Sequence, residues 1–192
     1  MVPSCELLAD LADILGVVNA APFLVEIGRA LSAAGLDAVL IGNAAAALQG
    51  APVTTVDFDF LFRRTPRNLQ KLKRFATVLQ ATVLRPYYPV SDMFRVVRDD
   101  GLQVDFMSTV HGVRSFEGLR ARASVVDIDG TELLVADLLD IIRSKRAAGR
   151  PRDVAVSGVL EQTHAAHQAR VATPRPPSHP GRTQTRKRPR QR

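Results

Sequence analysis

The chain has 192 residues, of which 46% are hydrophobic, and this length suits one domain with a substantial core. No stretch approaches the roughly 18 uninterrupted apolar residues of a membrane span, and the acidic start MVPSCELLADLAD lacks the basic segment of a signal peptide. We therefore expect a cytoplasmic protein with no membrane contact. The single cysteine, Cys5, excludes an intramolecular disulfide and a thiolate zinc cluster.

The net charge of +7 comes from the C-terminal end of the sequence. Seven basic residues and no acidic residue follow Val171, namely Arg175, Arg182, Arg186, Lys187, Arg188, Arg190 and Arg192. Without these seven, the chain has 19 basic and 19 acidic residues, so the remainder has no net charge. Proline and polar residues without apolar periodicity predict a disordered basic tail over 171–192. Such a tail would either hold RNA or DNA weakly, in a salt-sensitive way, or be a solvated extension without a specific task.

The first half of the chain predicts helices and strands in alternation. Apolar spacing predicts helices over 6–17 and 22–34, and Gly35 is a suitable C-terminal cap for the second. The apolar run 37–42 predicts a strand, and the alanine-rich segment 43–49 predicts a short helix stopped by Gly50 and Pro52. A second strand follows over 56–62. Thr65 and Pro66 form an N-cap and first-turn pair for a helix that ends near residue 80.

The second half predicts two hairpins and three helices. Segment 93–107 reads as two strands around an Asp-Gly turn, and a second Asp-Gly pair joins 124–128 to 131–135. Helices are expected over 115–123, 136–149 and 151–168. We therefore predict an α+β fold, a mixed β-sheet flanked by helices. Its single domain, 1–170, would comprise N-terminal helices 6–34, a catalytic core 36–135 and C-terminal helices 136–168.

Three aspartates are placed for metal chemistry. In a strand, side chains two positions apart share a face, so Asp57 and Asp59 point away from the apolar Phe58 and Phe60. Asp105 has the same relation to its apolar neighbours in the first hairpin. If these strands are neighbours, two carboxylates about 4 Å apart repel by roughly 4 kcal/mol at an effective dielectric near 20, and a magnesium ion would relieve this repulsion. The alternative is that the nearby arginines of the 56–64 segment simply neutralise an Asp-x-Asp pair without function.

The glycine turn at Gly42-Asn43 lies between a predicted strand and the N-terminus of a predicted helix. Free backbone N–H groups and the helix dipole bind phosphate at such a place. Asn43 could equally be an ordinary N-cap without a ligand. No Gly-Lys-Ser/Thr follows, so the turn is not a Walker loop.

In this joint order, the motifs resemble the minimal nucleotidyltransferases of the DNA polymerase β superfamily, and are most similar to AbiEii-like (MenT-like) toxins of toxin–antitoxin pairs. The resemblance covers roughly residues 22–165. Its carriers are IGNAAAALQGAPVTTVDFDFLF, TPRNLQKL, GLQVDFM, HGVRSFEGL and SKRAAGRPRD. The resemblance implies a polymerase β-like nucleotidyltransferase fold.

The resemblance also implies roles for individual residues. Asp57, Asp59 and Asp105 would bind two Mg²⁺ ions, with Asp105 helping to activate the acceptor hydroxyl. Other residues would hold the substrates: Gly42 and Asn43 would contact the triphosphate, Lys145 and Arg150 the nucleotide, and Asp153 the nucleotide or the acceptor. The family commonly has Gly or Ser at Asn43 and often a basic residue at Val53. The cations near Lys145 could instead only complement the helix dipole.

The implied activity is transfer of a nucleoside monophosphate from an NTP, such as ATP, to an acceptor hydroxyl with release of pyrophosphate. Toxin-like relatives suggest the 3′ end of tRNA or another RNA as acceptor, and an antitoxin protein as partner. Antibiotic-modifying relatives suggest a small molecule instead. Two further hypotheses are a catalytically degenerate nucleotide-binding or interaction protein, and a basic-tailed RNA-binding protein with incidental carboxylates.

Overall fold

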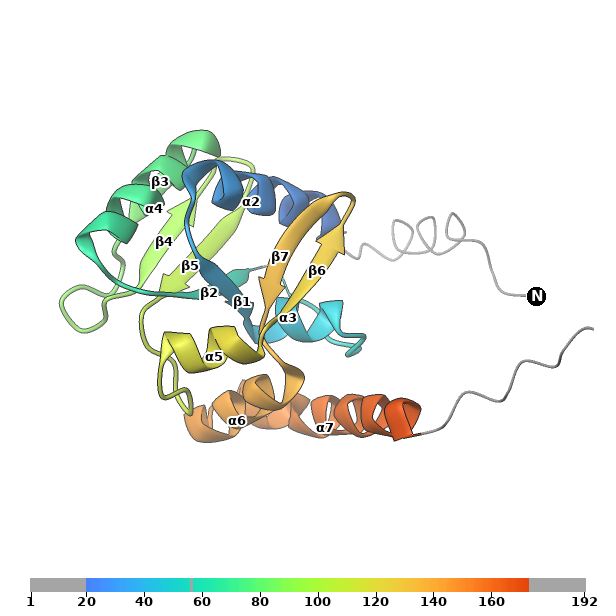
Figure 1. Ribbon diagram of the computed structural model, residues 1–192. Coiled ribbons are helices and arrows are strands. Elements are labelled where there is room, and N and C mark those ends of the chain that lie inside the picture. The colour runs from blue at the N-terminus through green and yellow to red at the C-terminus, as the bar shows by residue number, and fades with distance from the viewer. Residues whose placement is uncertain (1–19, 56, 173–192) are drawn as a thin grey trace, which may run out of the picture.

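The computed structural model describes residues 20–55 and 57–172 (Figure 1). The elements are α2 (Ala21–Ala34), β1 (Ala38–Ile41), α3 (Gly42–Leu48), β2 (Phe58–Phe62), α4 (Pro66–Val78), β3 (Thr82–Leu84), β4 (Phe94–Val97), β5 (Gln103–Met107), α5 (Phe116–Arg122), β6 (Ser124–Ile128), β7 (Thr131–Val135), α6 (Leu138–Ala148) and α7 (Pro151–Ala172). The helix expected over 6–17 and the segment from 173 onward lie outside the described residues.

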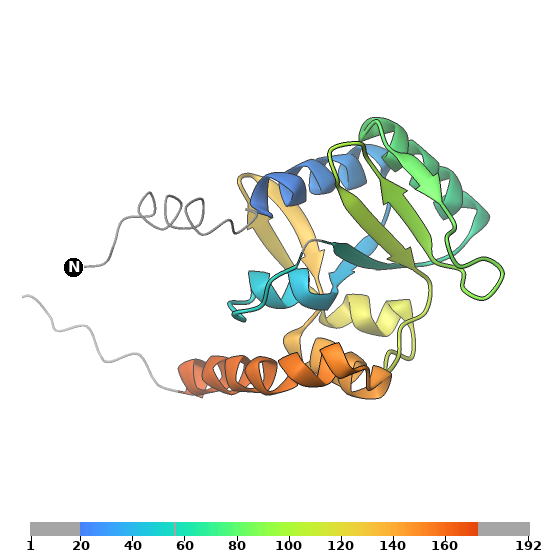
Figure 2. The ribbon, with the colours of Figure 1, turned by 180° about the vertical axis from the view of Figure 1, so that it is seen from behind.

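The strands form one mixed sheet in the order β3-β4-β5-β2-β1-β7-β6. Strands β2 and β5 are parallel, as are β1 and β7, and the other neighbours are antiparallel. Helices α2 and α4 cover one face of the sheet, whereas α5, α6 and α7 lie on its other side (Figures 1 and 2). The predicted α+β fold with helices flanking a mixed sheet is confirmed.

The face of the sheet under α4 is closed by four fully buried phenylalanine rings. Phe106 of β5 lies 5.5 Å from Phe60 of β2, 5.8 Å from Phe62 and 5.1 Å from Phe75 of α4, measured between ring centroids. Aromatic pairs of this kind contribute about 0.5–1.5 kcal/mol each beyond the burial of their area. The cluster therefore fixes which face of β2 and β5 is turned toward the core.

Capping residues mark the ends of three helices at the positions that the sequence predicts: Thr65 at the start of α4, Gly35 at the end of α2 and Gly149 at the end of α6. The hydroxyl of Thr65 accepts a hydrogen bond from the backbone N–H of Asn68 at 3.1 Å, which satisfies a free donor of the first turn of α4. Gly35 and Gly149 adopt left-handed conformations directly after α2 and α6. Both Asp-Gly hairpins are formed, as predicted.

Two strand assignments differ from expectation. Strand β3 is not predicted from the sequence, because three largely exposed residues at the sheet edge carry no alternation long enough to detect. Strand β2 begins at Phe58, two residues later than expected, so Asp57 lies in the bend that leads into it.

Helix α7 is 22 residues long and runs to Ala172, so the boundary expected at 171 for the tail falls within this helix. Its polar and charged residues are spread along its whole length. Among the described residues, no helix combines the length and the apolar character needed to cross a membrane.

Truncation of the central ring of the phenylalanine cluster tests this account of the core. We expect Phe106→Ala to lower the free energy of unfolding by about 3–5 kcal/mol, because it leaves a cavity among three rings. Urea denaturation measures the loss. Val125→Ala, at a side chain 58% exposed on β6, should change stability by less than about 0.5 kcal/mol. A loss below about 1 kcal/mol for Phe106→Ala would contradict the role given to the cluster.

Candidate active site

Strand pairing brings the predicted aspartates together. Asp59 of β2 is the direct register partner of Asp105 of β5, and Asp105 is in turn opposite Arg95 of β4. Because side chains alternate along a strand, these three point away from the buried face that carries Phe60 and Phe106. All three side chains line one cleft of about 610 Å³.

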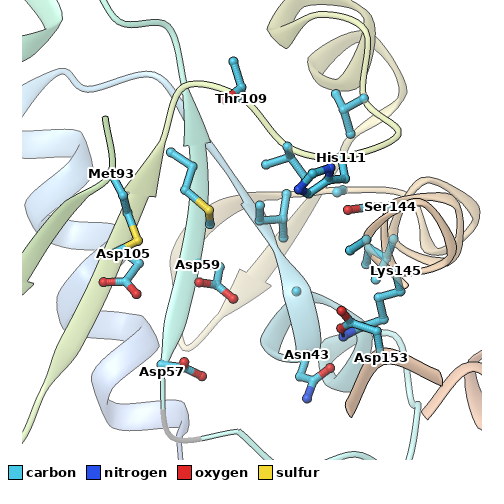
Figure 3. A pocket seen from close by; sticks show the side chains of 18 of the residues that line it. Asn43, Asp57, Asp59, Met93, Asp105, Thr109, His111, Ser144, Lys145 and Asp153 are labelled. Carbon is cyan, nitrogen blue, oxygen red and sulfur yellow. Dashed lines mark hydrogen bonds and ion pairs between the residues drawn. The ribbon is translucent and has the colours of Figure 1, made fainter. Parts of the chain in front are cut away.

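The cleft gathers every residue that the sequence proposes for the site. Its lining includes Gly42, Asn43, Asp57, Asp59, Asp105, Lys145, Arg150 and Asp153. Figure 3 shows Asp59 and Asp105 on adjacent strands along one side of the cleft, with Asp57 directly before the first of these strands. Lys145, Asp153 and Ser144 lie across from them on the helices. Val53, named above as a departure from the family, instead packs against the hydrophobic core. The roles assigned to these residues stay predictions.

Asp105 is held by an arginine that the sequence reading missed. The Arg95 guanidinium donates from Nε and Nη2 to the two carboxylate oxygens of Asp105 at 2.8 and 2.7 Å. Asp105 was expected to face outward, yet only 5% of its side chain is exposed, because Arg95 covers it from the neighbouring strand. A sequence signal existed, since residues 95 and 105 are equally distant from the hairpin turn at Asp100.

The carboxylates interact unfavourably, as their convergence predicts. Burial first, and then the charges of Asp57 and Asp105, raise the pKa of Asp59 from 3.8 to about 6. Arg152 and Lys145 act in the opposite direction without cancelling the effect. Arg152, which also lines the cleft, is a second cation that the sequence reading left out.

The arginines next to the Asp-x-Asp pair do not neutralise it. Arg63 forms an ion pair with Glu117 at 2.6 Å, and Arg64 forms one with Asp92 at 2.5 Å. Their side chains are committed to other elements of the fold. The Asp57 carboxylate instead accepts a hydrogen bond from the hydroxyl of Thr55 at 2.9 Å.

The expected three-carboxylate metal cluster is not assembled in this arrangement. Among the described residues, no group of three His, Cys, Asp or Glu side chains is placed to hold a metal ion, and both carboxylate oxygens of Asp105 accept hydrogen bonds from Arg95. The donor chemistry nevertheless fits magnesium, which prefers oxygen ligands and uses one or two carboxylates together with substrate phosphates. Asp57 and Asp59 supply such a pair. Each oxygen of Asp105 also keeps a lone pair after accepting one bond from Arg95.

Gly42 is required where the first strand enters α3. Its φ of +72° lies in the left-handed region, and a Cβ at this position would be 2.6 Å from Oδ2 of Asp59. A glycine therefore permits both the backbone turn and the close approach of the Asp59 carboxylate. The glycine turn and the Asp59 carboxylate therefore depend on each other for their positions.

Asn43 is not the N-cap of α3. Ile41 occupies that position, and no side chain caps the helix. The Asn43 amide donates to the carbonyl of Thr54 at 3.4 Å, while its Oδ1 is buried and has no hydrogen-bond partner among the described residues. A buried acceptor without a partner is costly.

Lys145 and Asp153 join α6 to α7 on the far wall of the cleft. Lys145 Nζ lies 3.2 Å from Asp153 Oδ1, and the two side chains are only 12% and 9% exposed. The cation is therefore partly buried beside the cleft and does not merely complement a helix dipole in solvent. Arg150 is exposed at the start of α7 and, together with Lys145, gives this wall a positive character.

The fold has counterparts among solved nucleotidyltransferase structures. The antibiotic-resistance factor ANT(2″)-Ia, solved with adenylyl-2″-tobramycin, matches with a TM-score of 0.53 and 15% identity, covering 81% of this chain and 100% of that chain. The lincosamide antibiotic adenylyltransferase LnuA, solved with lincomycin, matches with a TM-score of 0.55 and 10% identity over 77% and 98%. TM1012 of Thermotoga maritima, assigned as a nucleotidyltransferase, matches with a TM-score of 0.52 and 17% identity over 79% and 92%.

These structural matches show that the chain has the nucleotidyltransferase fold expected from the sequence. No family model matches the chain, and no curated protein matches it in sequence. At identities of 10–17%, the likeness defines the fold and leaves substrate and acceptor open.

Removal of the Asp59 charge should stabilise the protein when a chelator keeps metal away. Above pH 6 the folded chain holds Asp59 ionised at a cost that the unfolded chain, with a pKa of 3.8, does not bear. We expect Asp59→Asn to raise the free energy of unfolding by about 1–3 kcal/mol at pH 7–8. The gain should shrink as the pH falls from 6 and vanish below 3.8, where both states of the wild type are protonated.

Denaturation of both proteins across this pH range measures the difference. Asp99→Asn, at an exposed turn outside the cleft, is the matched control and should show no such pH-dependent gain. A variant that is less stable than wild type at pH 8 would contradict the electrostatic account.

Substitution of the cleft glycine should displace Asp59. Gly42→Ala and Gly50→Ala both introduce a Cβ at positive φ, but only the Cβ at Gly42 meets a neighbouring atom within 4 Å. We expect Gly50→Ala to cost about 1 kcal/mol from backbone strain, and Gly42→Ala to cost more and to weaken Mn²⁺ binding, which can be followed by calorimetry. Equal effects of the two changes on stability and on metal binding would refute the contact between Gly42 and Asp59.

Proposed function

We propose that this protein is a magnesium-dependent nucleotidyltransferase that transfers a nucleoside monophosphate from an NTP to an acceptor hydroxyl and releases pyrophosphate. The observation that carries the proposal is the pairing of Asp59 with Asp105 on adjacent parallel strands, beside Asp57, in a cleft whose far wall is cationic. The nucleotidyltransferase fold of the whole domain supports the same assignment.

Each part of the cleft has a distinct task in this reaction. Asp57 and Asp59 would hold the magnesium ion, and a bound ion supplies neutralisation of charge on the phosphates and on the departing pyrophosphate. The acceptor oxygen forms a bond to the α-phosphorus as the bond from that phosphorus to the pyrophosphate oxygen breaks. Asp105 keeps lone pairs that can accept the proton of the acceptor hydroxyl while Arg95 fixes the orientation of its carboxylate.

The far wall would receive the triphosphate. Arg150 and Arg152 are exposed and line the cleft, so their guanidinium groups can reach phosphate oxygens. Lys145 adds a partly buried positive charge, and its ion pair with Asp153 holds it in place. Asn43 Oδ1 is suited to accept a hydrogen bond from a nucleotide hydroxyl.

For the acceptor we propose the 3′-hydroxyl of an RNA, with tRNA as the leading candidate. The seven basic residues after Val171 favour a polyanionic partner, and the sequence resemblance to AbiEii-like toxins points the same way. A cytoplasmic toxin role with a neutralising antitoxin remains a prediction from that resemblance.

Two other functions have specific support. Tobramycin and lincomycin in the ANT(2″)-Ia and LnuA structures favour a small antibiotic as acceptor. The bidentate hold of Arg95 on Asp105 favours a degenerate protein that binds nucleotide without turnover. The first would show label on an antibiotic and none on RNA, and the second would show nucleotide binding alone.

Incubation with each labelled NTP, magnesium and total cellular RNA tests the proposal, with a parallel reaction that contains tobramycin or lincomycin. We expect label in RNA with the wild type and a loss of about 100-fold or more with Asp57→Ala/Asp59→Ala, because the variant lacks both proposed ion ligands. Asp99→Ala, outside the cleft, should retain activity. Equal labelling by wild type and double variant would refute the proposed site.

A further inference from the structure

The loop between β3 and β4 presents an unusual group of exposed apolar side chains. Tyr87 is 52% exposed, Tyr88 62% and Val90 94%, all within four residues. This loop, residues 85–93, projects from the edge of the domain at the left of Figure 1. Contiguous exposed apolar surface on a small domain commonly marks a binding site.

Arginine contacts fix this loop to the body of the domain. The Arg85 guanidinium carbon lies 3.9 Å from the ring centroid of Tyr88 and 5.2 Å from that of Phe94. Asp92 forms ion pairs with Arg85 at 3.1 Å and with Arg64 at 2.5 Å. The tyrosine rings are therefore presented by an anchored loop, which lowers the entropy lost when a ligand binds them.

The loop continues directly into the catalytic cleft. Tyr87, Asp92 and Met93 belong to the cleft lining, and Met93 stands beside Asp105 in Figure 3. Lys145 lies across the cleft from them. If the nucleotide binds at the cationic wall, the side of the cleft next to the loop stays open for the acceptor.

We propose that Tyr87 and Tyr88 form a stacking platform for the terminal bases of a single-stranded nucleic acid, which delivers its 3′-hydroxyl toward Asp105. Aromatic side chains bind unpaired bases through their π-faces, and nearby arginines bind the connecting phosphates. Arg64 and Arg85 together outweigh the one charge of Asp92, so the contacts of this loop carry a net positive charge that suits an anionic strand. The inference rests on the proposed nucleotidyl transfer and names its acceptor subsite.

The charge of the loop argues against a polycationic acceptor. Asp92 is the single acidic residue in segment 85–93, and both of its carboxylate oxygens already contact arginines. An acceptor with several amino groups would find guanidinium groups there instead of free carboxylates. The platform therefore favours a nucleic-acid end over a polyamine-like small molecule.

Fluorescence of 2-aminopurine at the 3′-terminal positions of a short single-stranded RNA tests the platform with the full chain. Stacking on an aromatic ring changes this fluorescence and is worth about 1–3 kcal/mol per base, which corresponds to roughly 5- to 150-fold in Kd. We expect Tyr87→Ala/Tyr88→Ala to weaken RNA binding by such a factor and to abolish the signal, whereas Tyr87→Phe/Tyr88→Phe keeps both. Val125→Ala, at an exposed position on β6 outside the cleft, is the control and should behave like wild type.

Elevated salt screens the contribution of the basic residues after Val171, so the measurement is made at low and high ionic strength. A DNA strand of the same sequence tells whether the platform depends on the 2′-hydroxyl. Unchanged RNA affinity and fluorescence in the double alanine variant would overturn the inference.

Binding of a fluorescent NTP analogue to the same variants separates this inference from the proposed function. We expect Tyr87→Ala/Tyr88→Ala to bind the NTP analogue normally and to lose transfer to RNA. If the wild type stacks the RNA end but transfers no label from any NTP, the proposed function fails while the platform stands. If label is transferred to RNA equally by wild type and the tyrosine variant, the platform fails while the function stands.

Discussion

The parallel register of β2 with β5 is the constraint on which the site depends. Phe60 and Phe106 are paired across these strands and buried against α4, so the residues one position earlier, Asp59 and Asp105, must share the opposite face. A slip of one residue would turn the carboxylates into the core and the rings into the cleft. The core packing therefore specifies the site geometry directly.

That geometry places like charges together at a cost to the fold. The raised pKa of Asp59 reflects burial first and the neighbouring carboxylates second. The domain relieves only part of this repulsion, through Arg95 on Asp105 and through the more distant charges of Arg152 and Lys145. Such a site has a strong electrostatic preference for a cation, which is the property that a magnesium-dependent transferase needs.

The two sides of the cleft differ in chemistry, and this difference suits a transfer reaction between two bound substrates. The wall formed by α6 and α7 carries lysine and arginine side chains suited to phosphates. The wall formed by β4, β5 and the loop before β4 carries methionine and tyrosine beside one bound arginine. The carboxylates of Asp59 and Asp105 lie on the strand side of the cleft and face the cationic wall, where a donor nucleotide and an acceptor would meet.

The sequence by itself determined the features that depend on neighbouring residues: the helix ends at Thr65, Gly35 and Gly149, the two Asp-Gly hairpins, and the alternation that puts Asp59 and Asp105 opposite their apolar neighbours. Only the tertiary structure decided that β2 and β5 are adjacent, that Arg95 holds Asp105 and that Lys145 pairs with Asp153. Capping and alternation are local and can be read within a few residues, whereas strand order and ion pairing are selected by the packing of segments far apart in the chain.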